Sequence, residues 1–580
     1  MDVPLALSLA AAFGASAFIC TRRIVYALGR RGPALAPAFL ASLWYASLWL
    51  GGFSGSLLGA ALAAAAPLAA LAAVALMRSR PRRLPAARWS LIDGAAFAFI
   101  AATIFLLPLE DANLQHPILA TIRRGNLPPA ALNDPSFPLA YHWLYTGSGA
   151  LVSRAFGISA DLALHVVSAA LLAVVVCALR ALSALLFRGA GARQAARVFF
   201  LLGFGPIYLR PGPAADVEDV LHGLTTQSFA EAIVRPPVVL GFALLLLALG
   251  MLLPRLPPAG GGEDRPAHPA FLLPALLALP QASEECAALT ALLLALLWAR
   301  GRLAGAWLAA FAVVMALSAS FSGVFRAFFL GGSPMPVPQA LPAWPPILLS
   351  WTGAAPLFSR RAAATMFYEW GPVFLATLVA SWSDARRRAC ALLFVAGFAV
   401  AALVREGTWG GHDYDRFLFP GTALGFLMSA IWIERLAALP RRAAAALGAA
   451  LCLFVLGGPL ACFGYRLRAL GLGASALARG LREPAAELDR ALAAVGPREQ
   501  IVTDAELAGP LLAHGFIVAA PIEGNLGCPA CVDRGAFEDY MRRFRGHPRW
   551  YLLPAGDPRL SGARVMGAYE GRVLARAREA

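Results

Sequence analysis

Two adjacent carboxylates, Glu110 and Asp111, follow directly after an apolar run of the sequence. At a membrane surface such carboxylates are readily solvated, and either one can take the proton of a hydroxyl group. Arg416, in the segment HDYDRFLFP, immediately precedes another apolar run, and its planar guanidinium suits a phosphate group. These residues therefore offer a general base and an anion-binding group. The alternative interpretations are a solvated helix end for the acidic pair and, for Arg416, pairing with Asp413 or Asp415.

The polar segment 108–145 also contains histidine and aromatic side chains. His116 can orient the base or contact a phosphate, and it can equally be an ordinary residue near the start of a helix. Tyr141 and His142 suit a polyhydroxylated ligand such as a sugar, or else they anchor the chain at the membrane surface. We expect Trp143 and Tyr145 to be such anchors, because Trp and Tyr are enriched at the level of the lipid headgroups.

Two further groups of ionisable residues belong to this set of candidates. His412 stands near Arg416 in the sequence and can bind the same ligand. Glu284 and Glu285 lie between two short apolar segments, which predict a hairpin over 270–299 with an acidic tip. If these carboxylates lie below the membrane surface, their desolvation is costly and indicates a functional site. Exposure at the tip is the other interpretation.

The elements that must position these residues are membrane helices. The chain has 580 residues, of which 59% are hydrophobic and 14% charged, and its mean hydropathy is +0.66. This composition excludes a soluble globular protein and predicts an α-helical polytopic membrane protein with about 14 spans. Besides the hairpin, the apolar runs are 3–20, 33–50, 55–77, 89–107, 160–187, 196–209, 233–253, 303–321, 368–383, 387–404, 416–433 and 442–463.

The formal net charge of +16 comes from arginine alone, since the sequence contains no lysine. The arginines cluster in short segments between apolar runs, which is typical of cytoplasmic loops and argues against nucleic-acid binding. These clusters all fall on loops of one parity, so the loop 108–159 and everything after about residue 463 are expected on the opposite face. The sequence therefore predicts a multi-pass protein of a bacterial inner membrane, with a transmembrane domain over 1–465.

Local patterns predict structure within the loop 108–159. The segment HPILATIRRG predicts a short amphipathic helix that has Pro117 in its first turn and Ile118, Leu119 and Ile122 on one face, and that can end at Gly125. A helix of this kind lies along the membrane interface. Pro138 is expected to open a second helix that includes the histidine and tyrosines of 141–145.

Beyond residue 480 the composition changes to that of a soluble unit. Helix and strand patterns alternate there, with strands predicted at QIVTD, FIVAAP and RWYLLP, which indicates a small parallel α/β domain over 480–580. The loop parity places this domain outside the cytoplasm. Cys528 and Cys531 form a close pair in it, and in an oxidising compartment we expect them to be joined as a local disulfide.

The order of these features resembles the GT-C superfamily of membrane glycosyltransferases. The segments LEDANLQHPILATIRRGNLPP and DYDRFLFPGTALGFL carry the resemblance. It implies transfer of a sugar from a polyprenyl-phosphate donor to an extracytoplasmic acceptor (a cell-envelope glycan, lipid or protein), with catalysis in the loop 108–159. Asp111 or Glu110 is then the base; members commonly have Asp-Glu where this chain has Glu-Asp. The residues expected to bind substrate are His116, Tyr141, His142, Glu284, Glu285, His412 and Arg416.

A transfer of this kind requires no cofactor, because a polyprenyl phosphate leaves as a stable anion that needs no protonation. Some members of the superfamily hold a divalent metal with acids from two outer loops, and carboxylates suit Mg²⁺ or Mn²⁺. The second outer loop here contains Asp216, Glu218 and Asp219. The favoured interpretation of these three acids is the start of a surface helix, and metal binding is the alternative.

Two other functions are compatible with a polytopic membrane protein. A transporter or flippase of a lipid-linked saccharide would use discontinuous helices such as those expected at 270–299, but it would hold its ionisable residues in the middle of the spans. A non-catalytic envelope protein would depend on its C-terminal domain alone.

Overall fold

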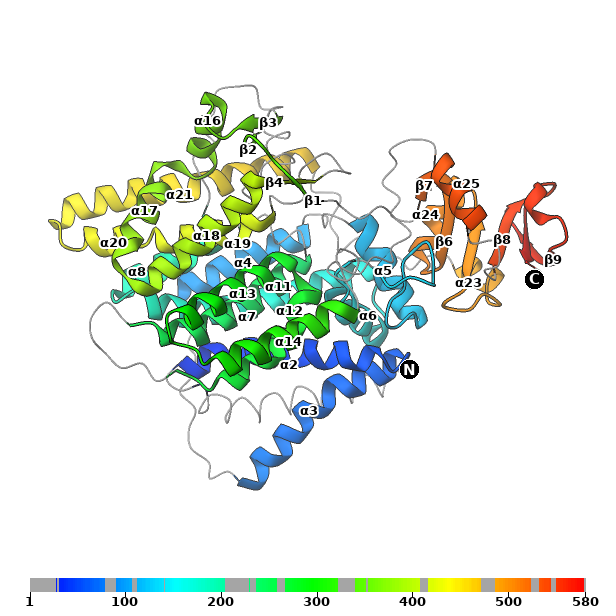
Figure 1. Cartoon of the computed structure of the whole chain (residues 1–580), viewed down its shortest axis with the longest axis horizontal. Helices are drawn as coiled ribbons and strands as arrows, with labels where there is room; N and C mark the ends of the chain where they lie inside the picture. Colours follow the sequence, from blue (N-terminus) through cyan, green and yellow to red (C-terminus); the bar gives the residue numbers. More distant parts are fainter. Residues whose placement is uncertain are drawn as a thin grey trace.

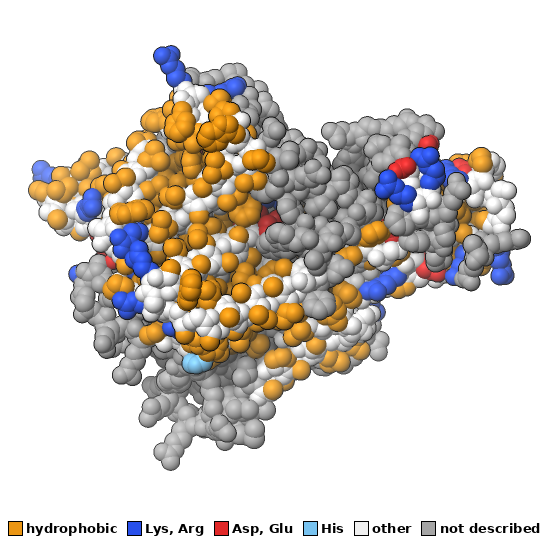
Figure 2. All heavy atoms as spheres, viewed as in Figure 1, with side chains coloured by type: hydrophobic (Ala, Val, Ile, Leu, Met, Phe, Trp, Pro, Cys, Tyr) orange, Lys and Arg blue, Asp and Glu red, His pale blue; other side chains and the backbone are white. Residues whose placement is uncertain are grey.

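The computed structural model describes residues 28, 31–78, 90–106, 112–139, 141–203, 229, 236–257, 266–321, 340–350, 353–406, 416–470, 486–522, 531–543 and 549–577. This part of the chain is mostly helical (Figure 1). Long helices run side by side in a helical body, and a sheet near the C-terminus lies beyond one end of it. Apolar side chains cover most of the visible surface of the helical body (Figure 2), as expected of a protein surrounded by lipid.

The helical body is built from seventeen α-helices within the described residues. They are α2 (Gly32–Gly52), α3 (Leu57–Arg78), α4 (Leu91–Leu106), α5 (Ala112–Arg124), α6 (Leu144–Phe156), α7 (Ala160–Leu186), α8 (Ala190–Leu202), α11 (Pro236–Leu252), α12 (Leu273–Ala282), α13 (Glu284–Ala299), α14 (Gly305–Phe321), α16 (Arg360–Glu369), α17 (Gly371–Ala380), α18 (Ala385–Leu403), α19 (Leu418–Met428), α20 (Ile431–Leu436) and α21 (Arg441–Leu470).

Three described helices are long and apolar enough to cross a membrane: Gly32–Gly52, Ala160–Leu186 and Pro237–Arg255. A fourth candidate is the pair formed by α16 and the segment Gly371–Ser383, which is bent by 85° between its two parts. The runs predicted at 33–50, 160–187 and 233–253 coincide with the first three. The run 3–20 lies outside the described residues, and the total of about 14 spans stays a prediction.

The hairpin predicted over 270–299 is present as α12 and α13. Ser283 separates the two helices in an extended conformation, and its hydroxyl oxygen accepts a hydrogen bond from the Cys286 amide at 3.1 Å, which starts α13. His268, just before α12, packs against Trp307 in α14 with ring centroids 5.5 Å apart. Because Trp307 follows α13, this contact shows that α13 returns the chain to the level at which α12 began.

The arginine-rich turns meet at one end of the helical body. Glu434 in α20 accepts hydrogen bonds from the Arg188 and Gly189 amides at 2.6 and 3.2 Å and from Arg387 at 2.7 Å. Arg188 and Gly189 follow the end of α7, and Arg387 lies in the first turn of α18. We call this the basic end. The opposite end of the helical body contains the starts of α7 and α19.

The chain after residue 486 forms a six-stranded sheet with the strand order β7-β6-β5-β8-β10-β9. Its strands are β5 (Gln500–Thr503), β6 (Ile517–Ile522), β7 (Cys531–Asp533), β8 (Arg549–Pro554), β9 (Arg564–Tyr569) and β10 (Arg572–Arg576), and its helices are α23 (Ala486–Ala491), α24 (Ala505–Ala513) and α25 (Arg534–Arg543). Strands β5, β6, β7 and β8 pair in parallel, and β10 pairs antiparallel with β8 and β9.

The strands predicted at QIVTD, FIVAAP and RWYLLP are β5, β6 and β8, and the parallel pairing between them is as expected. The β9–β10 hairpin was not anticipated. The domain boundaries 1–465 and 480–580 stay a prediction. Cys528 lies outside the described residues, and Cys531 begins β7, so the expected disulfide is untested. Two small antiparallel pairings, β1 (Ala340–Pro342) with β4 (Val404–Glu406) and β2 (Ile347–Ser350) with β3 (Gly353–Pro356), complete the described strands.

The C-terminal sheet packs directly on α5 and the loop after it. Arg124 at the end of α5 lies 3.8 Å above the Phe516 ring and contacts Asp489 at 3.0 Å. The Val518 amide donates to the Leu132 carbonyl at 2.8 Å, which extends the pairing of β6 into the loop. Since two segments in direct contact lie on the same side of a membrane, the C-terminal sheet and the loop after α5 share one side.

Polar contacts reinforce this interface. Arg498 donates to the carbonyls of Leu127 and Pro128 at 2.6 and 2.9 Å. The Tyr540 hydroxyl donates to the buried Asp134 carboxylate at 2.6 Å, and burial, with Asp134 adding to its effect, raises the pKa of Tyr540. Tyr540 therefore stays protonated and remains a donor throughout the physiological pH range.

Candidate active site

Helix α5 follows the acidic pair without a gap, because its first residue, Ala112, comes directly after Asp111. Glu110 and Asp111 themselves lie outside the described residues. The expected position of Pro117 in the first turn of this helix is wrong: Pro117 lies further inside α5, where it removes one backbone hydrogen bond without ending the helix. The expected end is confirmed, since Gly125 adopts a φ of +106° directly after Arg124.

The inner face of α5 is the one that the sequence predicted. Ile118 and Ile122 are both fully buried, together with Leu119. The second predicted helix, by contrast, does not begin at Pro138. Pro138 forms a β-bridge with Ala130, and α6 starts only at Leu144. The backbone hydrogen bonds of this bridged loop leave residues 141 and 142 ahead of the helix.

A first cluster of ionisable residues joins the starts of α5 and α7. His116 Nε2 in α5 lies 3.2 Å from an Asp161 carboxylate oxygen in α7. His165, one turn later in α7, is fully buried, and its Nδ1 lies 2.6 Å from the Asp161 carbonyl and 3.6 Å from the carboxylate. Phe105, near the end of α4, stacks on the His165 ring at 6.0 Å. The acidic pair is thus bracketed in sequence by α4 and α5, both of which contribute to this cluster.

A second cluster is buried where α6, α13 and α19 begin. His142 Nε2 lies 2.7 Å from Glu284 Oε2, and the two side chains are only 6% and 15% exposed. Glu285 is also buried and accepts a hydrogen bond from the Ser283 hydroxyl at 2.6 Å. The structure therefore brings together residues that are far apart in the sequence, and the acidic tip of the hairpin is buried rather than exposed.

The positive charge of Arg416 partly offsets the negative charges of Glu284 and Glu285 in this cluster. The Arg416 guanidinium lies close enough for its charge to act on His142, Glu284 and Glu285. Burial alone would lower the pKa of His142, but the negative charge of Glu284 and its contact with the ring outweigh burial, so the pKa of His142 is raised above its ordinary value. His142 consequently carries a positive charge over a wider pH range than a free histidine does.

Tyr145 connects the two clusters. Its hydroxyl donates to the Leu164 carbonyl in α7, and it accepts from the Ser168 hydroxyl at 2.8 Å. Tyr145 lies within one turn of His142 in the chain and contacts α7 one turn beyond Asp161. Tyr141 packs against the His142 ring with centroids 5.1 Å apart. The clusters therefore lie on either side of the first turn of α6.

The expectation that Trp143 and Tyr145 anchor the chain at the membrane surface is wrong. Both residues are almost fully buried within the helical body. A Cβ atom on Gly52 in α2 would lie 2.8 Å from the Trp143 ring, so the indole occupies the space that this glycine leaves. Their aromatic rings serve packing and, for Tyr145, internal hydrogen bonding.

The helix geometry makes this end of the molecule suitable for an anion. His142 precedes α6 by two residues, Glu284 is the first residue of α13, and Arg416 precedes α19 by two residues. The starts of helices carry partial positive charge from free backbone amides, so three helix starts, Arg416 and His142 oppose the two carboxylates. His142 Nδ1 is buried and has no hydrogen-bond partner among the described residues, which leaves a donor or acceptor for a ligand.

An apolar groove of 560 Å³ runs along the bent helix pair formed by α16 and α17. Its lining includes Leu357 before α16, Met366 in α16, Trp370 at the bend and Phe394 in α18. A groove of this size and character can hold part of a long hydrocarbon chain.

The other predicted site residues are not placed by the structure. His412 and the three acids Asp216, Glu218 and Asp219 lie outside the described residues, as do Glu110 and Asp111. Within the described ranges no group of three or more His, Cys, Asp or Glu side chains has the geometry of a metal site. The metal alternative for the second outer loop remains untested.

Asp161 and His165 were missed by the sequence analysis. Asp161 stands in the first turn of a long apolar helix, where an acid is ordinary and stabilises the helix start. His165 follows it at the spacing i,i+4, which places both on one face. The sequence signal that could have identified this pair is the i,i+4 spacing of an acid and a histidine in the first turns of a membrane helix.

No family model and no curated protein sequence matches the chain. Among solved structures, ArnT from Cupriavidus metallidurans in the apo state is 13% identical, with a TM-score of 0.41 over 83% of this chain and 97% of ArnT. The apo oligosaccharyltransferase of Archaeoglobus fulgidus is 12% identical, with a TM-score of 0.37 over 74% of this chain and 64% of its own.

A third similar structure is the Archaeoglobus fulgidus oligosaccharyltransferase AglB in complex with an inhibitory peptide and a dolichol-phosphate. It is 11% identical, with a TM-score of 0.35 over 74% of this chain and 63% of AglB. This chain thus spans less than two thirds of either oligosaccharyltransferase structure. Matches at this identity and TM-score assign no family to this chain and no role to any of its residues.

Proposed function

We propose that this chain is a membrane glycosyltransferase that moves a sugar from a polyprenyl-phosphate donor to an acceptor on the extracytoplasmic face. The observation that carries the proposal is the cluster of the buried His142 and Glu285 with the partly buried Glu284 and Arg416. Charged side chains are costly to bury in a membrane protein and are retained where they act on a ligand. This cluster combines anion-binding groups with carboxylates that can accept hydrogen bonds from sugar hydroxyls.

The parts of the site have complementary roles in such a reaction. Arg416 and the neighbouring helix starts hold the phosphate of the donor, and His142 and the two glutamates contact its sugar. Asp111 or Glu110 takes the proton of the acceptor hydroxyl, whose oxygen then bonds to the anomeric carbon as the bond to the phosphate breaks. The polyprenyl phosphate leaves as an anion, so no general acid is required. The isoprenoid chain lies in the groove lined by Leu357 and Phe394.

The position of the charged cluster favours this reaction over transport. A transporter binds its substrate near the middle of the bilayer, between two halves that rock around it. His142, Glu284 and Arg416 instead all stand within two residues of the start of a helix. In the proposed reaction, an acceptor from the aqueous side meets the donor at these helix ends.

Steady-state kinetics of three variants tests the proposal. Asp111→Asn, if Asp111 is the base, lowers turnover by a factor of about 10² to 10⁴ with donor binding largely intact, because a base acts on the acceptor proton only in the transition state. Arg416→Ala weakens donor binding as well as turnover. Glu110→Gln is the control that decides which carboxylate is the base. Near wild-type turnover in both Asp111→Asn and Glu110→Gln would exclude the loop 108–159 as the catalytic centre.

A further inference from the structure

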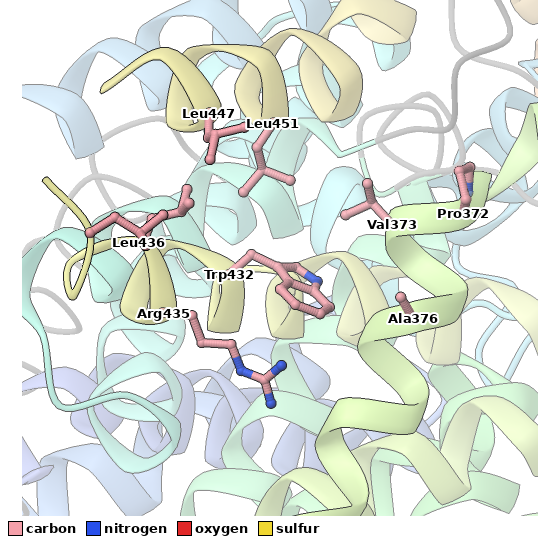
Figure 3. Close-up of a pocket in the computed structure, with 9 residues that line it drawn as sticks. Pro372, Val373, Ala376, Trp432, Arg435, Leu436, Leu447 and Leu451 are labelled. Atoms are coloured by element: carbon pink, nitrogen blue, oxygen red, sulfur yellow. The ribbon is translucent and has the colours of Figure 1, made fainter. Parts of the chain in front are cut away.

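A second apolar groove reaches the basic end of the helical body, where Glu434 of α20 lies. It has a volume of 540 Å³ and runs between α17, α20 and α21 (Figure 3). Its lining residues are Pro372, Val373, Ala376, Trp432, Arg435, Leu436, Leu439, Leu447 and Leu451. Arg435 is the only charged residue among them, so the groove is a hydrocarbon surface with one cation.

The cation and the aromatic ring beside it are held in a fixed arrangement. The Arg435 guanidinium lies 4.8 Å from the centroid of the Trp432 ring. The Trp432 indole Nε1 donates a hydrogen bond to the Thr377 hydroxyl oxygen at 2.8 Å, which fixes the ring against α17. In Figure 3 the Arg435 side chain extends past the indole rather than into the leucine side chains above it.

Two more arginines follow at the start of α21. Arg441 and Arg442 are exposed, directly after the turn that contains the lining residue Leu439. Arg435, Arg441 and Arg442 have no carboxylate partner among the described residues. By contrast Arg387, at the same end, is neutralised by Glu434 at 2.7 Å. The described residues around the turn after α20, which borders the groove, therefore carry an excess of positive charge.

The direction of the helices separates this groove from the donor site. Helices α19 and α20 lead from Leu418, two residues after Arg416, to Leu436 with only a two-residue interruption. A helical path of that length covers about 28 Å at 1.5 Å per residue, close to the hydrocarbon thickness of a bilayer. The groove thus opens at the opposite membrane face from the cluster around His142.

We propose that this groove binds an anionic phospholipid of the bilayer, with the headgroup phosphate at Arg435, Arg441 and Arg442 and an acyl chain along Leu436, Leu447 and Leu451. Basic pockets between membrane helices on the cytoplasmic side attract anionic headgroups, and each arginine near the surface strengthens binding roughly fivefold. The groove supplies the apolar contact that a free phosphate cannot use. This site is independent of the proposed glycosyltransferase activity.

Native mass spectrometry of the purified full-length protein in mild detergent tests the proposal. Titration with phosphatidylglycerol is expected to give a bound lipid at concentrations at which phosphatidylcholine with the same acyl chains does not bind. The variant with Arg435→Gln, Arg441→Gln and Arg442→Gln is expected to lose affinity by about a hundredfold. Leu447→Trp fills the groove from an exposed position and is expected to displace the lipid with all three arginines intact.

Arg302→Gln is the matched control, because Arg302 is an exposed arginine in the turn after α13 and does not line the groove. It is expected to leave phosphatidylglycerol affinity unchanged. Equal binding of phosphatidylglycerol and phosphatidylcholine, or an equal loss in Arg302→Gln and the triple variant, would overturn the proposal. So would inorganic phosphate that binds as tightly as the lipid, since the groove would then contribute nothing.

Discussion

The contact between His142 and Glu284 predicts a pH-dependent stability that a single substitution removes. The two side chains are almost fully buried and 2.7 Å apart. Two unit charges at that distance attract each other by about 6 kcal/mol at an effective dielectric constant of about 20, before the cost of burying them is subtracted. Removal of one partner from a buried pair typically costs about 3–5 kcal/mol, because the other charge is left uncompensated.

The sign of the pH dependence follows from the raised pKa of His142. A histidine whose pKa is higher in the folded than in the unfolded chain contributes stability that is fully present below its unfolded pKa, about 6.5. This contribution is lost as the pH rises through the raised pKa of the folded state. In Glu284→Gln the glutamine holds no charge opposite the ring, so His142 becomes neutral at lower pH. The destabilisation caused by Glu284→Gln should therefore be largest near pH 6 and shrink as the pH increases.

A double-mutant cycle of Glu284→Gln and His142→Asn isolates the pair from its neighbours. Chemical unfolding of the purified protein, followed at several pH values, gives the coupling energy as the difference between the double variant and the sum of the single variants. We expect about 3 kcal/mol near pH 6. Glu487→Gln, at an exposed carboxylate of α23, is the control and should change the stability by less than about 0.5 kcal/mol. A coupling energy below about 0.5 kcal/mol, or one that grows with pH, would refute the reasoning.

Two further predictions concern the C-terminal sheet. Gly515 has a φ of +81° and lies against the α5 backbone, so Gly515→Val should release the sheet from α5 and accelerate limited proteolysis between the sheet and α5. The control is Gly562→Val, because Gly562 has a φ of +77° but no neighbour within 4 Å, so that its substitution adds only local strain of about 1–2 kcal/mol. Equal proteolysis of the two variants would contradict the packing of the sheet on α5. Single cysteines at the exposed positions Ser136 and Ser561, in a cysteine-free background, should both react with a membrane-impermeant reagent in intact spheroplasts. Labelling of only one of them would break the predicted topology.

The membrane helices and the C-terminal strands could be predicted because their signals are local. The apolar runs at 33–50, 160–187 and 233–253 and the strand patterns at QIVTD, FIVAAP and RWYLLP depend on composition and periodicity over a few turns or residues. The hairpin over 270–299 was predictable for the same reason. Its break at Ser283 could be predicted because the neighbouring polar residues interrupt two apolar segments.

The relations between distant segments could not be predicted in this way. His142 and Glu284 were separate candidates in the sequence, and only the packing of α6 against the tip of the hairpin makes them a pair. Trp143 and Tyr145 have the composition of interfacial anchors, but Gly52 and the Leu164 carbonyl, both far away in the chain, supply the buried space and the acceptor that hold them inside. The starts of α5 and α6 were misplaced because proline permits a helix start without requiring one.

The central claim is that the protein cleaves the bond between a sugar and a polyprenyl phosphate. The most direct test places the purified protein in proteoliposomes with a polyprenyl-phosphate sugar labelled in both the sugar and the lipid, together with candidate acceptors. We predict that labelled sugar appears on the acceptor in step with free polyprenyl phosphate, and that Arg416→Ala slows both. Movement of the intact donor across the bilayer, with both labels still joined, would contradict the claim and identify a transporter.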